Sequence, residues 1–514
     1  MNLIDLLDRG ACLDAQRPCF LQEGRTFTYG DVRDLTFRIG SALRAEGFCP
    51  GDVGAVLSHN DATAFTCALS LVRAGGIWVP INPRSVAEEI AYFLDFTGVQ
   101  TLFYGSAFED LVTSLRKRCP GIRSFVCIDA IGTNGVGLSD WIKPFDARAF
   151  FVPYDAADTV AIGATGGTTG QSKGVMLSHR NIATFVANVL ACMPFESPPV
   201  YLAAAPLTHA AGIMVLAFMA LGGTTVVLEK PDPQTIMKSV SEHQIDTLLL
   251  PPTMIYMLLS QPNVRSFDYS SLKYFIYAAA PMSTEKLREA IEVFGPVMTQ
   301  MYGQAEAPMT ITFMGPKEHR PLDFPSRLRS CGRVSPFVRV AVMDDEGRLL
   351  GDDMVGEIVV QGDLVMKGYL DNPDATAQVS RFGWHHTGDI GYRDAQGFYY
   401  IIDRKKDLII TGGFNVFPSE IEQVIASHPA VHECAVIGVP DDKWGEAVKA
   451  VVQTRPGRTV SQEELIALCK SRLGSVKAPK SIDFVSELPH SPVGKILKRK
   501  VRDTYWSGHD RMVG

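Results

Sequence analysis

The sequence predicts an α/β protein with a large N-terminal domain of helix-covered sheets, a small β-barrel-like subdomain and a small α+β C-terminal domain. Strand and helix patterns alternate from residue 27 onward, which is typical of parallel sheets covered by helices. Short glycine-bounded strands follow at close intervals from 332 to 369, as in a small barrel or sandwich. Beyond 408, strands flank one helical stretch in a segment of about 110 residues, a common domain size.

The N-terminal elements follow from hydrophobic spacing. Val32, Leu35 and Ile39 recur at helical intervals within 31–43. A buried helix is expected at 61–74, between strands at 52–58 and 77–80. Further strands are expected at 200–205, 245–253 and 272–277, and a helix from Glu285. At 514 residues the chain exceeds one hydrophobic core, so at least two domains are expected.

Composition excludes several classes of protein. The net charge of −7 argues against nucleic acid as a partner, because phosphate backbones need a basic surface. Ten scattered cysteines without a Cys-x-x-Cys indicate reduced thiols of a cytoplasmic protein, and His385-His386 is read as structural. No signal peptide is visible, and Gly222-Gly223 divides the apolar stretch 213–228 into helix, turn and strand. We expect a soluble cytoplasmic protein without an integral membrane segment.

A glycine-rich loop lies between apolar strands at 159–162 and 175–177. Glycine lets backbone N–H groups converge on an anion, threonines add hydroxyl donors and a lysine adds positive charge, so the loop predicts a polyphosphate cradle. It is not a Walker A loop, since Gly174 rather than serine or threonine follows Lys173. The alternative is a flexible surface linker. The candidate phosphate contacts are Thr165, Gly166, Gly167, Thr168, Thr169, Gly170 and Lys173.

Three later side chains suit a nucleotide. An aromatic ring at Tyr302 can stack on a purine, and Glu306 offers the carboxylate oxygen that Mg²⁺ prefers. Asp389 can accept hydrogen bonds from both ribose hydroxyls. The charge run 403–407 after a strand is a natural linker. In isolation, residues 384–407 favour the alternative of a pair of β-turns with solvated charges.

Together these motifs resemble those of the adenylate-forming superfamily, which includes acyl-CoA synthetases, peptide-synthetase adenylation domains and firefly luciferase. The resemblance spans nearly the whole chain, up to a Gly494-Lys495 near the C-terminus. It implies an ATP- and acyl-binding domain at 1–402, a hinge at 403–407 containing Asp403, and a mobile C-terminal domain at 408–514. The chain departs from the usual pattern at several positions. These are Gly166 for serine, Ser172 for proline, Thr208 for an aromatic residue, Ala278 and Ala279 for glycines, and Ala305 for threonine.

The resemblance also assigns roles. Lys495, Glu306 and His209 are implied as catalytic residues, and Glu306 as the metal ligand. Nucleotide contacts beyond the loop are implied at Ala279, Ala280, Tyr302, Gly303, Asp389, Arg404 and Lys495. Acyl contacts are implied at His209, Ala210, Gly212, Ala278, Met301 and Ala307, and coenzyme A contacts at Gly412, Gly413 and Trp444.

The implied reaction is activation of a carboxylic acid by ATP, with Mg²⁺, to an acyl-adenylate, followed by transfer to coenzyme A. The implied acyl positions are almost all small or apolar, so a second charge on the acid would be buried without a partner. This predicts an apolar monocarboxylic acid of the fatty, aryl or alicyclic kind. The alternatives are an acyl-AMP ligase that loads a carrier protein, a peptide-synthetase domain, a luciferase-like oxygenase and a non-catalytic acyl-nucleotide sensor. A homodimer is left open.

Overall fold

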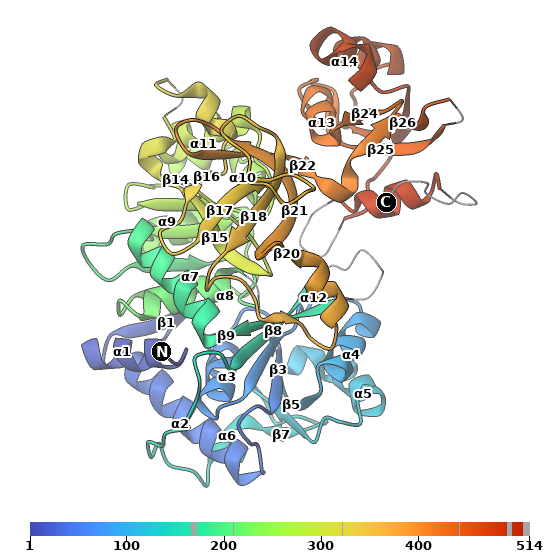
Figure 1. Cartoon of the computed structure of the whole chain (residues 1–514). Coiled ribbons are helices and arrows are strands. Elements are labelled where there is room, and N and C mark those ends of the chain that lie inside the picture. The colour runs from blue at the N-terminus through green and yellow to red at the C-terminus, as the bar shows by residue number, and fades with distance from the viewer. Residues whose placement is uncertain (166–171, 209, 321, 442, 491–495, 507–514) are drawn as a thin grey trace. The chain divides into compact units, whose positions relative to one another are not determined.

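A computed structural model of the chain describes residues 1–165, 172–208, 210–320, 322–441, 443–490 and 496–506 (Figure 1). Two compact units are present, one formed by Met1–Val340 with Val360–His385 and the other by Ala341–Val359 with His386–Gly514. Both combine helices and sheets, so the predicted α/β class is confirmed. The predicted domain boundary at 403–407 concerns a hinge motion, which this division does not test, and it stays a prediction.

The first unit contains an eight-stranded sheet, and the glycine-rich loop lies in the chain between its strands β8 and β9. The strand order is β19-β9-β8-β4-β3-β5-β6-β7. Neighbours from β8 to β7 are parallel, whereas β8 and β9 form an antiparallel hairpin and β19 pairs antiparallel with β9. The bounds are β3 (Val53–Leu57), β4 (Ile77–Pro80), β5 (Val99–Tyr104), β6 (Ser124–Cys127), β7 (Val136–Gly137), β8 (Thr159–Thr165), β9 (Lys173–Ser178) and β19 (Gly368–Tyr369). The loop therefore links two strands, as predicted.

Helices cover both faces of this sheet. In Figure 1, α4 and α5 lie on the opposite side of β3 and β5 from α2 and α3. Ile90 of α4 and Leu115 of α5 pack with Leu102 of β5 in one buried cluster. The Asp61 side chain accepts a hydrogen bond from the Ala64 backbone N–H and starts the predicted buried helix. The bounds are α2 (Tyr29–Ala45), α3 (Ala62–Arg73), α4 (Ala87–Phe96), α5 (Glu109–Arg118) and α6 (Leu138–Ile142).

The second sheet of this unit positions the predicted acyl and adenine residues. Its strands run β16-β15-β14-β13-β12-β10-β11-β1-β2. From β14 to β1 all neighbours are parallel, while β14 and β15 form an antiparallel hairpin. The bounds are β1 (Pro18–Gln22), β2 (Arg25–Thr28), β10 (Val200–Ala203), β11 (Thr224–Val227), β12 (Thr247–Leu250), β13 (Tyr274–Tyr277), β14 (Met298–Gln304), β15 (Ala307–Met314) and β16 (Gly332–Val334).

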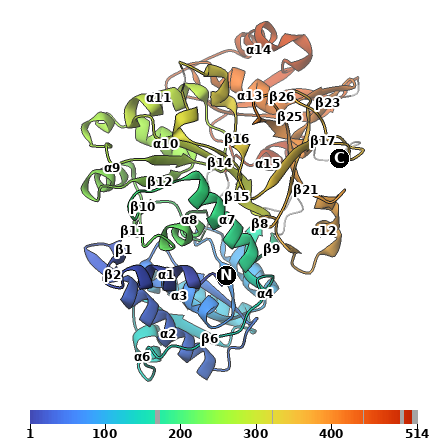
Figure 2. The ribbon, with the colours of Figure 1, turned by 60° about the vertical axis from the view of Figure 1, so that its left-hand side comes forward.

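Helices α9, α10 and α11 lie along one side of this sheet, as Figure 2 shows near β12 and β14. Ile236, Ile255 and Leu287 from these helices share a buried cluster with Leu248 and Phe275 of the sheet. The helix bounds are α1 (Asp5–Leu13), α7 (His179–Cys192), α8 (Ala210–Met219), α9 (Pro233–Glu242), α10 (Pro252–Leu259), α11 (Thr284–Phe294) and α12 (Pro373–Val379). The predicted helix, turn and strand over 213–228 are α8 and β11. In the part of the chain that the structure describes, no helix is long and apolar enough to cross a membrane.

The second unit contains the predicted short strands and the α+β segment. Strands β17 (Arg339–Met343), β18 (Gly356–Gln361), β21 (Trp384–Arg393) and β22 (Phe398–Arg404) are successive neighbours; β17, β18 and β21 extend into the first unit. A five-stranded sheet follows in the order β24-β23-β26-β25, with β27 beside β26. The remaining bounds are β20 (Ser380–Arg381), β23 (Ile409–Thr411), β24 (Phe414–Val416), β25 (Val431–Asp441), β26 (Gly445–Thr454), β27 (Ser481–Val485), α13 (Pro418–Ala426), α14 (Gln462–Lys477) and α15 (Lys498–Asp503). Its core includes Ile421, Val448 and Leu465.

Candidate active site

The predicted acyl and adenine residues follow parallel strands of one sheet. Ala210 begins α8 after β10, Ala278 follows β13, and Tyr302 lies near the end of β14. Parallel strands bring their carboxyl ends to the same edge of a sheet, where ligands bind in open α/β folds. The topology therefore gathers these predicted residues at one edge. His209 lies outside the described residues.

The turn between β10 and α8 is held by a buried asparagine that the sequence interpretation missed. The Asn60 side-chain oxygen accepts a hydrogen bond from Leu207 N–H at 2.8 Å, and its amide donates to the Ala205 carbonyl at 3.0 Å. A Cβ on Gly212 would lie 1.9 Å from the Leu207 carbonyl oxygen, so only glycine fits there. Gly212 thus shapes the backbone of the predicted acyl wall. The one sequence signal for Asn60 is its place just after a strand.

The loop after β13 contains strained backbone. Ala279 has φ +71°, in the left-handed region that disfavours residues with a Cβ. This is where the superfamily pattern has glycine. Ala278, one residue earlier, is buried, whereas Ala279 is exposed. Ala279 therefore adopts the left-handed backbone conformation that glycine would adopt without strain.

Replacing Ala279 with glycine should stabilise the protein. Glycine removes the left-handed penalty of roughly 1–2 kcal/mol, and the greater freedom of the unfolded chain offsets part of that gain. We expect the urea midpoint to rise by an amount that corresponds to about 0.5–1 kcal/mol. Ala278→Gly is the control, because Ala278 is absent from the residues with positive φ and should lose stability. Equal losses from both substitutions would contradict the assignment of strain.

Glu306 lies at the tip of the hairpin between β14 and β15, where Gln304 pairs with Ala307. A Cβ on Gly303 would lie 2.3 Å from the backbone nitrogen of Met309, so the close approach of the two strands requires glycine. Met301 and Ala307, predicted to contact the acyl group, are both buried in this hairpin. Gly303 therefore fixes the turn that presents Glu306.

Tyr369 contacts both Glu306 and Lys173, the first residue of β9. The Tyr369 hydroxyl donates a hydrogen bond to the Glu306 carboxylate at 2.7 Å, and the Lys173 ammonium lies 4.8 Å from the centre of the Tyr369 ring. Burial, together with the charge and hydrogen bond of Glu306, raises the pKa of Tyr369. The sequence interpretation treated 366–369 only as a strand, because nothing local marks a contact 63 residues away.

The Glu306 carboxylate fits the predicted Mg²⁺. Tyr369 occupies one carboxylate oxygen, and the other forms no hydrogen bond within the described ranges. Among the described residues there is no cluster of three His, Cys, Asp or Glu side chains that could hold a metal by themselves. Mg²⁺ needs only one or two carboxylates where phosphate oxygens supply further ligands. A single carboxylate is therefore a suitable protein ligand for a Mg²⁺ that also binds phosphate oxygens.

The predicted ribose site lies in the second unit. Asp389 is 2% exposed, and its carboxylate pairs with the Arg404 guanidinium at 2.6 Å. The two residues face each other across the β21–β22 ladder. The Asp403 carboxylate accepts hydrogen bonds from the backbone N–H of Arg404 and of Ser419, both at 2.8 Å. The predicted hinge residue thus ties the end of β22 to the first turn of α13.

The three predicted coenzyme A residues lie together. Gly412 and Gly413 have φ +56° and +81° in the turn between β23 and β24. The Gly412 N–H donates to the Trp444 carbonyl at 2.8 Å, and a Cβ on Gly412 would lie 2.5 Å from Trp444 Cε3. Trp444 is 41% exposed, so its indole can contact a ligand. Lys495, Gly494 and residues 166–171 of the phosphate loop lie outside the described residues.

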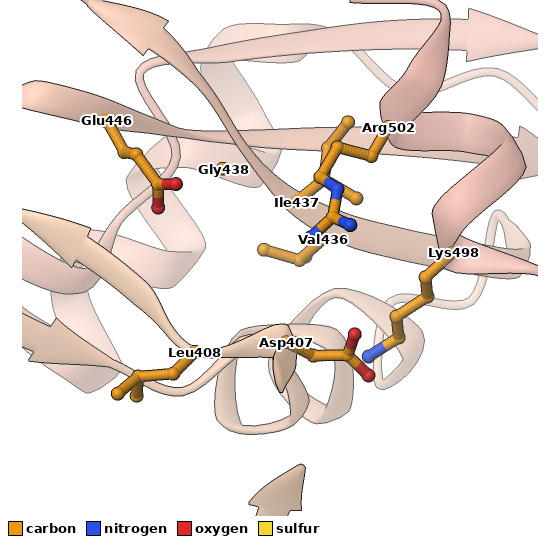
Figure 3. A pocket seen from close by; sticks show the side chains of 8 residues that line it. All are labelled: Asp407, Leu408, Val436, Ile437, Gly438, Glu446, Lys498 and Arg502. Carbon is orange, nitrogen blue, oxygen red and sulfur yellow. The ribbon is translucent and has the colours of Figure 1, made fainter. Parts of the chain in front are cut away.

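Figure 3 shows a small pocket within the second unit. Its lining residues are Asp407, Leu408, Val436, Ile437, Gly438, Glu446, Lys498 and Arg502. The Lys498 ammonium forms an ion pair with Glu422 at 2.9 Å and points toward Asp407 in the view. Burial opposes the charge on Lys498, but Glu422 and Asp403 outweigh it and raise the pKa of Lys498. Acidic and basic side chains both line this pocket, so its charges do not favour either an anionic or a cationic ligand.

The residue types at these predicted positions are those expected of a nucleotide-dependent enzyme. A family model described as AMP-binding enzyme matches residues 8–370, and a model described as AMP-binding enzyme C-terminal domain matches 420–495. The chain belongs to the AMP-binding enzyme family.

The medium/long-chain-fatty-acid–CoA ligase FadD8 of Mycobacterium tuberculosis is 36% identical over 513 residues, covering 96% of this chain and 88% of that protein. The fatty acid–[acyl-carrier-protein] ligase ScoC of Streptomyces coeruleorubidus is 32% identical over 503 residues, covering 96% and 95%. The structure of the amide bond synthetase McbA from Marinactinospora thermotolerans has a TM-score of 0.89 at 29% identity, covering 98% of this chain and 100% of that one.

These similarities confirm the predicted superfamily and the predicted class of enzyme, an acyl-CoA synthetase. Use of ATP and coenzyme A follows from membership of that family. The individual site residues, Mg²⁺ and the oligomeric state stay predictions.

Proposed function

We propose that the protein activates an apolar monocarboxylic acid, of the fatty, aryl or alicyclic kind, and transfers its acyl group to coenzyme A. The observation that carries this proposal is the chemistry of the predicted acyl wall. No ionisable side chain is present among its described members Ala210, Gly212, Ala278, Met301 and Ala307. A second carboxylate or an amine would lose hydration there without gaining a partner, at a cost of several kcal/mol. The fatty-acid names of FadD8 and ScoC support the same choice.

In the first step a carboxylate oxygen of the acid attacks the α-phosphorus of ATP. The bond to the β-phosphate breaks, pyrophosphate leaves and an acyl-adenylate forms. The acid is already ionised, so no general base is needed. Lys173 and Lys495 supply positive charge where anions meet. Mg²⁺, held by Glu306, would neutralise phosphate oxygens when bound.

In the second step the thiol sulfur of coenzyme A attacks the acyl carbon. The carbon–oxygen bond breaks, AMP leaves and the thiol loses its proton. We assign the pantetheine to Gly412 and Gly413, where backbone without side chains allows close approach. Asp389 is assigned to the ribose hydroxyls, with Arg404 beside it. None of the ten cysteines, all of which lie in the described residues, forms a disulfide, which supports the predicted cytoplasmic location.

A second candidate function is loading of the acyl group onto a carrier protein, which the similarity to ScoC favours. Both functions share the adenylation step and differ only in the thiol acceptor. Pyrophosphate release alone cannot separate them, whereas the identity of the acylated product can. Detection of acyl-CoA by mass spectrometry supports transfer to coenzyme A. Acylation of a carrier protein without any acylation of coenzyme A supports loading of a carrier protein.

The acid class is tested by pyrophosphate release from a panel of acetate, decanoate, palmitate, cinnamate, malonate and alanine. We expect kcat/KM for decanoate, palmitate or cinnamate to exceed that for acetate, malonate and alanine by at least about tenfold, which corresponds to roughly 1.4 kcal/mol. Each assay is run with and without coenzyme A. Best activity with malonate, alanine or acetate would overturn the assignment of an apolar acyl wall.

A further inference from the structure

We propose that Tyr369 is a positioning residue that holds Glu306 and Lys173 apart and in place for a metal–polyphosphate complex. The inference rests on the proposed function, because it takes Lys173 as a phosphate contact and Glu306 as a metal ligand. It concerns a residue to which the sequence interpretation gave no role.

The segment containing Tyr369 is bonded to both partners through its backbone. Tyr369 pairs with Val175 on β9, and the Leu370 N–H donates to the Gly174 carbonyl at 2.8 Å. At the other end, the Met366 N–H donates to the Glu306 carbonyl at 2.7 Å. Residues 366–370 therefore connect the strand that leaves the phosphate loop to the hairpin tip that carries Glu306.

The Tyr369 side chain then contacts the two charged groups differently. Its hydroxyl donates to the Glu306 carboxylate at 2.7 Å, a hydrogen bond strengthened by the negative charge. Its ring lies 4.8 Å from the Lys173 ammonium, within the range of a cation–π contact. The tyrosine itself is fixed, because Tyr369 N–H donates to the Thr376 hydroxyl at 2.9 Å and its side chain is largely buried.

The arrangement keeps two opposite charges near one ring without pairing them. Within the described ranges, Lys173 and Glu306 form no ion pair with each other. A direct ion pair would neutralise both groups and would have to be broken before a phosphate or a cation could bind. Preorganised charges need no such rearrangement, and this preorganisation is the main source of electrostatic catalysis. Tyr369 thus keeps the lysine available for phosphate and one carboxylate oxygen available for a cation.

The inference is tested by binding rather than turnover. Tyr369→Phe keeps the ring but removes the hydroxyl, whereas Tyr369→Leu removes both. With α,β-methylene-ATP, which is not cleaved at the bond the enzyme breaks, Mn²⁺ binding is measured by electron paramagnetic resonance and metal-free nucleotide binding by calorimetry. We expect Tyr369→Phe to weaken Mn²⁺ binding by about tenfold and to leave metal-free nucleotide binding unchanged. We expect Tyr369→Leu to weaken both, because Lys173 also loses its contact.

A thermodynamic cycle sharpens the test. In a Glu306→Gln background, Tyr369→Phe should have no further effect on Mn²⁺ binding, since the two residues act through one hydrogen bond. Tyr104→Phe is the matched control: its hydroxyl donates to the Glu109 carboxylate at 3.0 Å elsewhere in the same unit, and its loss should leave Mn²⁺ binding unchanged.

Wild-type Mn²⁺ binding in Tyr369→Phe, or the same loss from Tyr104→Phe, would overturn the inference. The measurement contains neither acid nor coenzyme A. It therefore fails or succeeds separately from the proposed substrate and acceptor, which the acid panel tests.

Discussion

Replacing Lys495 with alanine should strongly slow acyl-adenylate formation while sparing the thioester step. During adenylation a carboxylate approaches a triphosphate, and the positive charge of the lysine stabilises the two anions at close range. Loss of one such preorganised donor lowers the rate by on the order of 10²–10³. Attack of coenzyme A on a supplied acyl-adenylate expels AMP and involves no triphosphate. We expect its rate to stay within about twofold of the wild type. Single-turnover assays that start from ATP plus acid, or from the acyl-adenylate, measure the two steps separately.

A neighbouring lysine provides the control. Lys500 lies five positions after Lys495 and is exposed on α15, so Lys500→Ala removes the same charge from the same region. It should leave both steps unchanged. An equal loss of both steps in Lys495→Ala would refute a role confined to adenylation and would indicate damage to the C-terminal region as a whole.

Replacing Gly412 with alanine should slow the thioester step and spare acyl-adenylate formation, the opposite of the effect expected for Lys495→Ala. The added Cβ would lie 2.5 Å from Trp444 Cε3 at a residue with φ +56°, so both the indole and the backbone must shift. If this turn lines the path of the pantetheine, we expect the thioester step to slow by about tenfold or more, corresponding to about 1.4 kcal/mol of transition-state stabilisation. Pyrophosphate release in the absence of coenzyme A should be unchanged. Rapid-quench measurement of both products checks the two rates.

Gly457→Ala separates this effect from backbone strain. Gly457 has φ +71° in the same unit, and a Cβ there would meet no atom within 4 Å. It should cost stability without slowing either step. A thioester rate in Gly412→Ala equal to that of Gly457→Ala would remove the reason to place the pantetheine at this turn.

Local sequence signals predicted much of the fold because the interactions behind them are local. The helix at 62–73 follows from hydrophobic spacing and from Asp61, which hydrogen bonds three residues ahead. Ser178 and Asn181, three residues apart, cap α7 reciprocally. The glycine-rich loop lies between strands whose apolar character is visible in the sequence. In each case the partners lie within a few residues of each other.

The features that the sequence did not predict depend on long-range contacts or on conformation. Asn60 and Leu207 meet across 147 residues, and only the packing of two sheets brings them together. Tyr369 reaches Glu306 because β19 pairs with β9 at the edge of its sheet. A strand of only two residues gives no sequence signal for that pairing. The left-handed conformation of Ala279 is likewise invisible from its residue type, since alanine rarely adopts it.

The central claim is that the acid is activated as an acyl-adenylate, and isotope transfer tests it most directly. The enzyme is given decanoate labelled with ¹⁸O in its carboxylate, together with ATP and coenzyme A. Attack of a carboxylate oxygen on the α-phosphorus, followed by cleavage of the acyl carbon–oxygen bond, should leave one ¹⁸O in AMP and none in pyrophosphate. Mass spectra of AMP and pyrophosphate measure the ¹⁸O content of each product. Unlabelled AMP, or ADP together with labelled inorganic phosphate, would contradict the account.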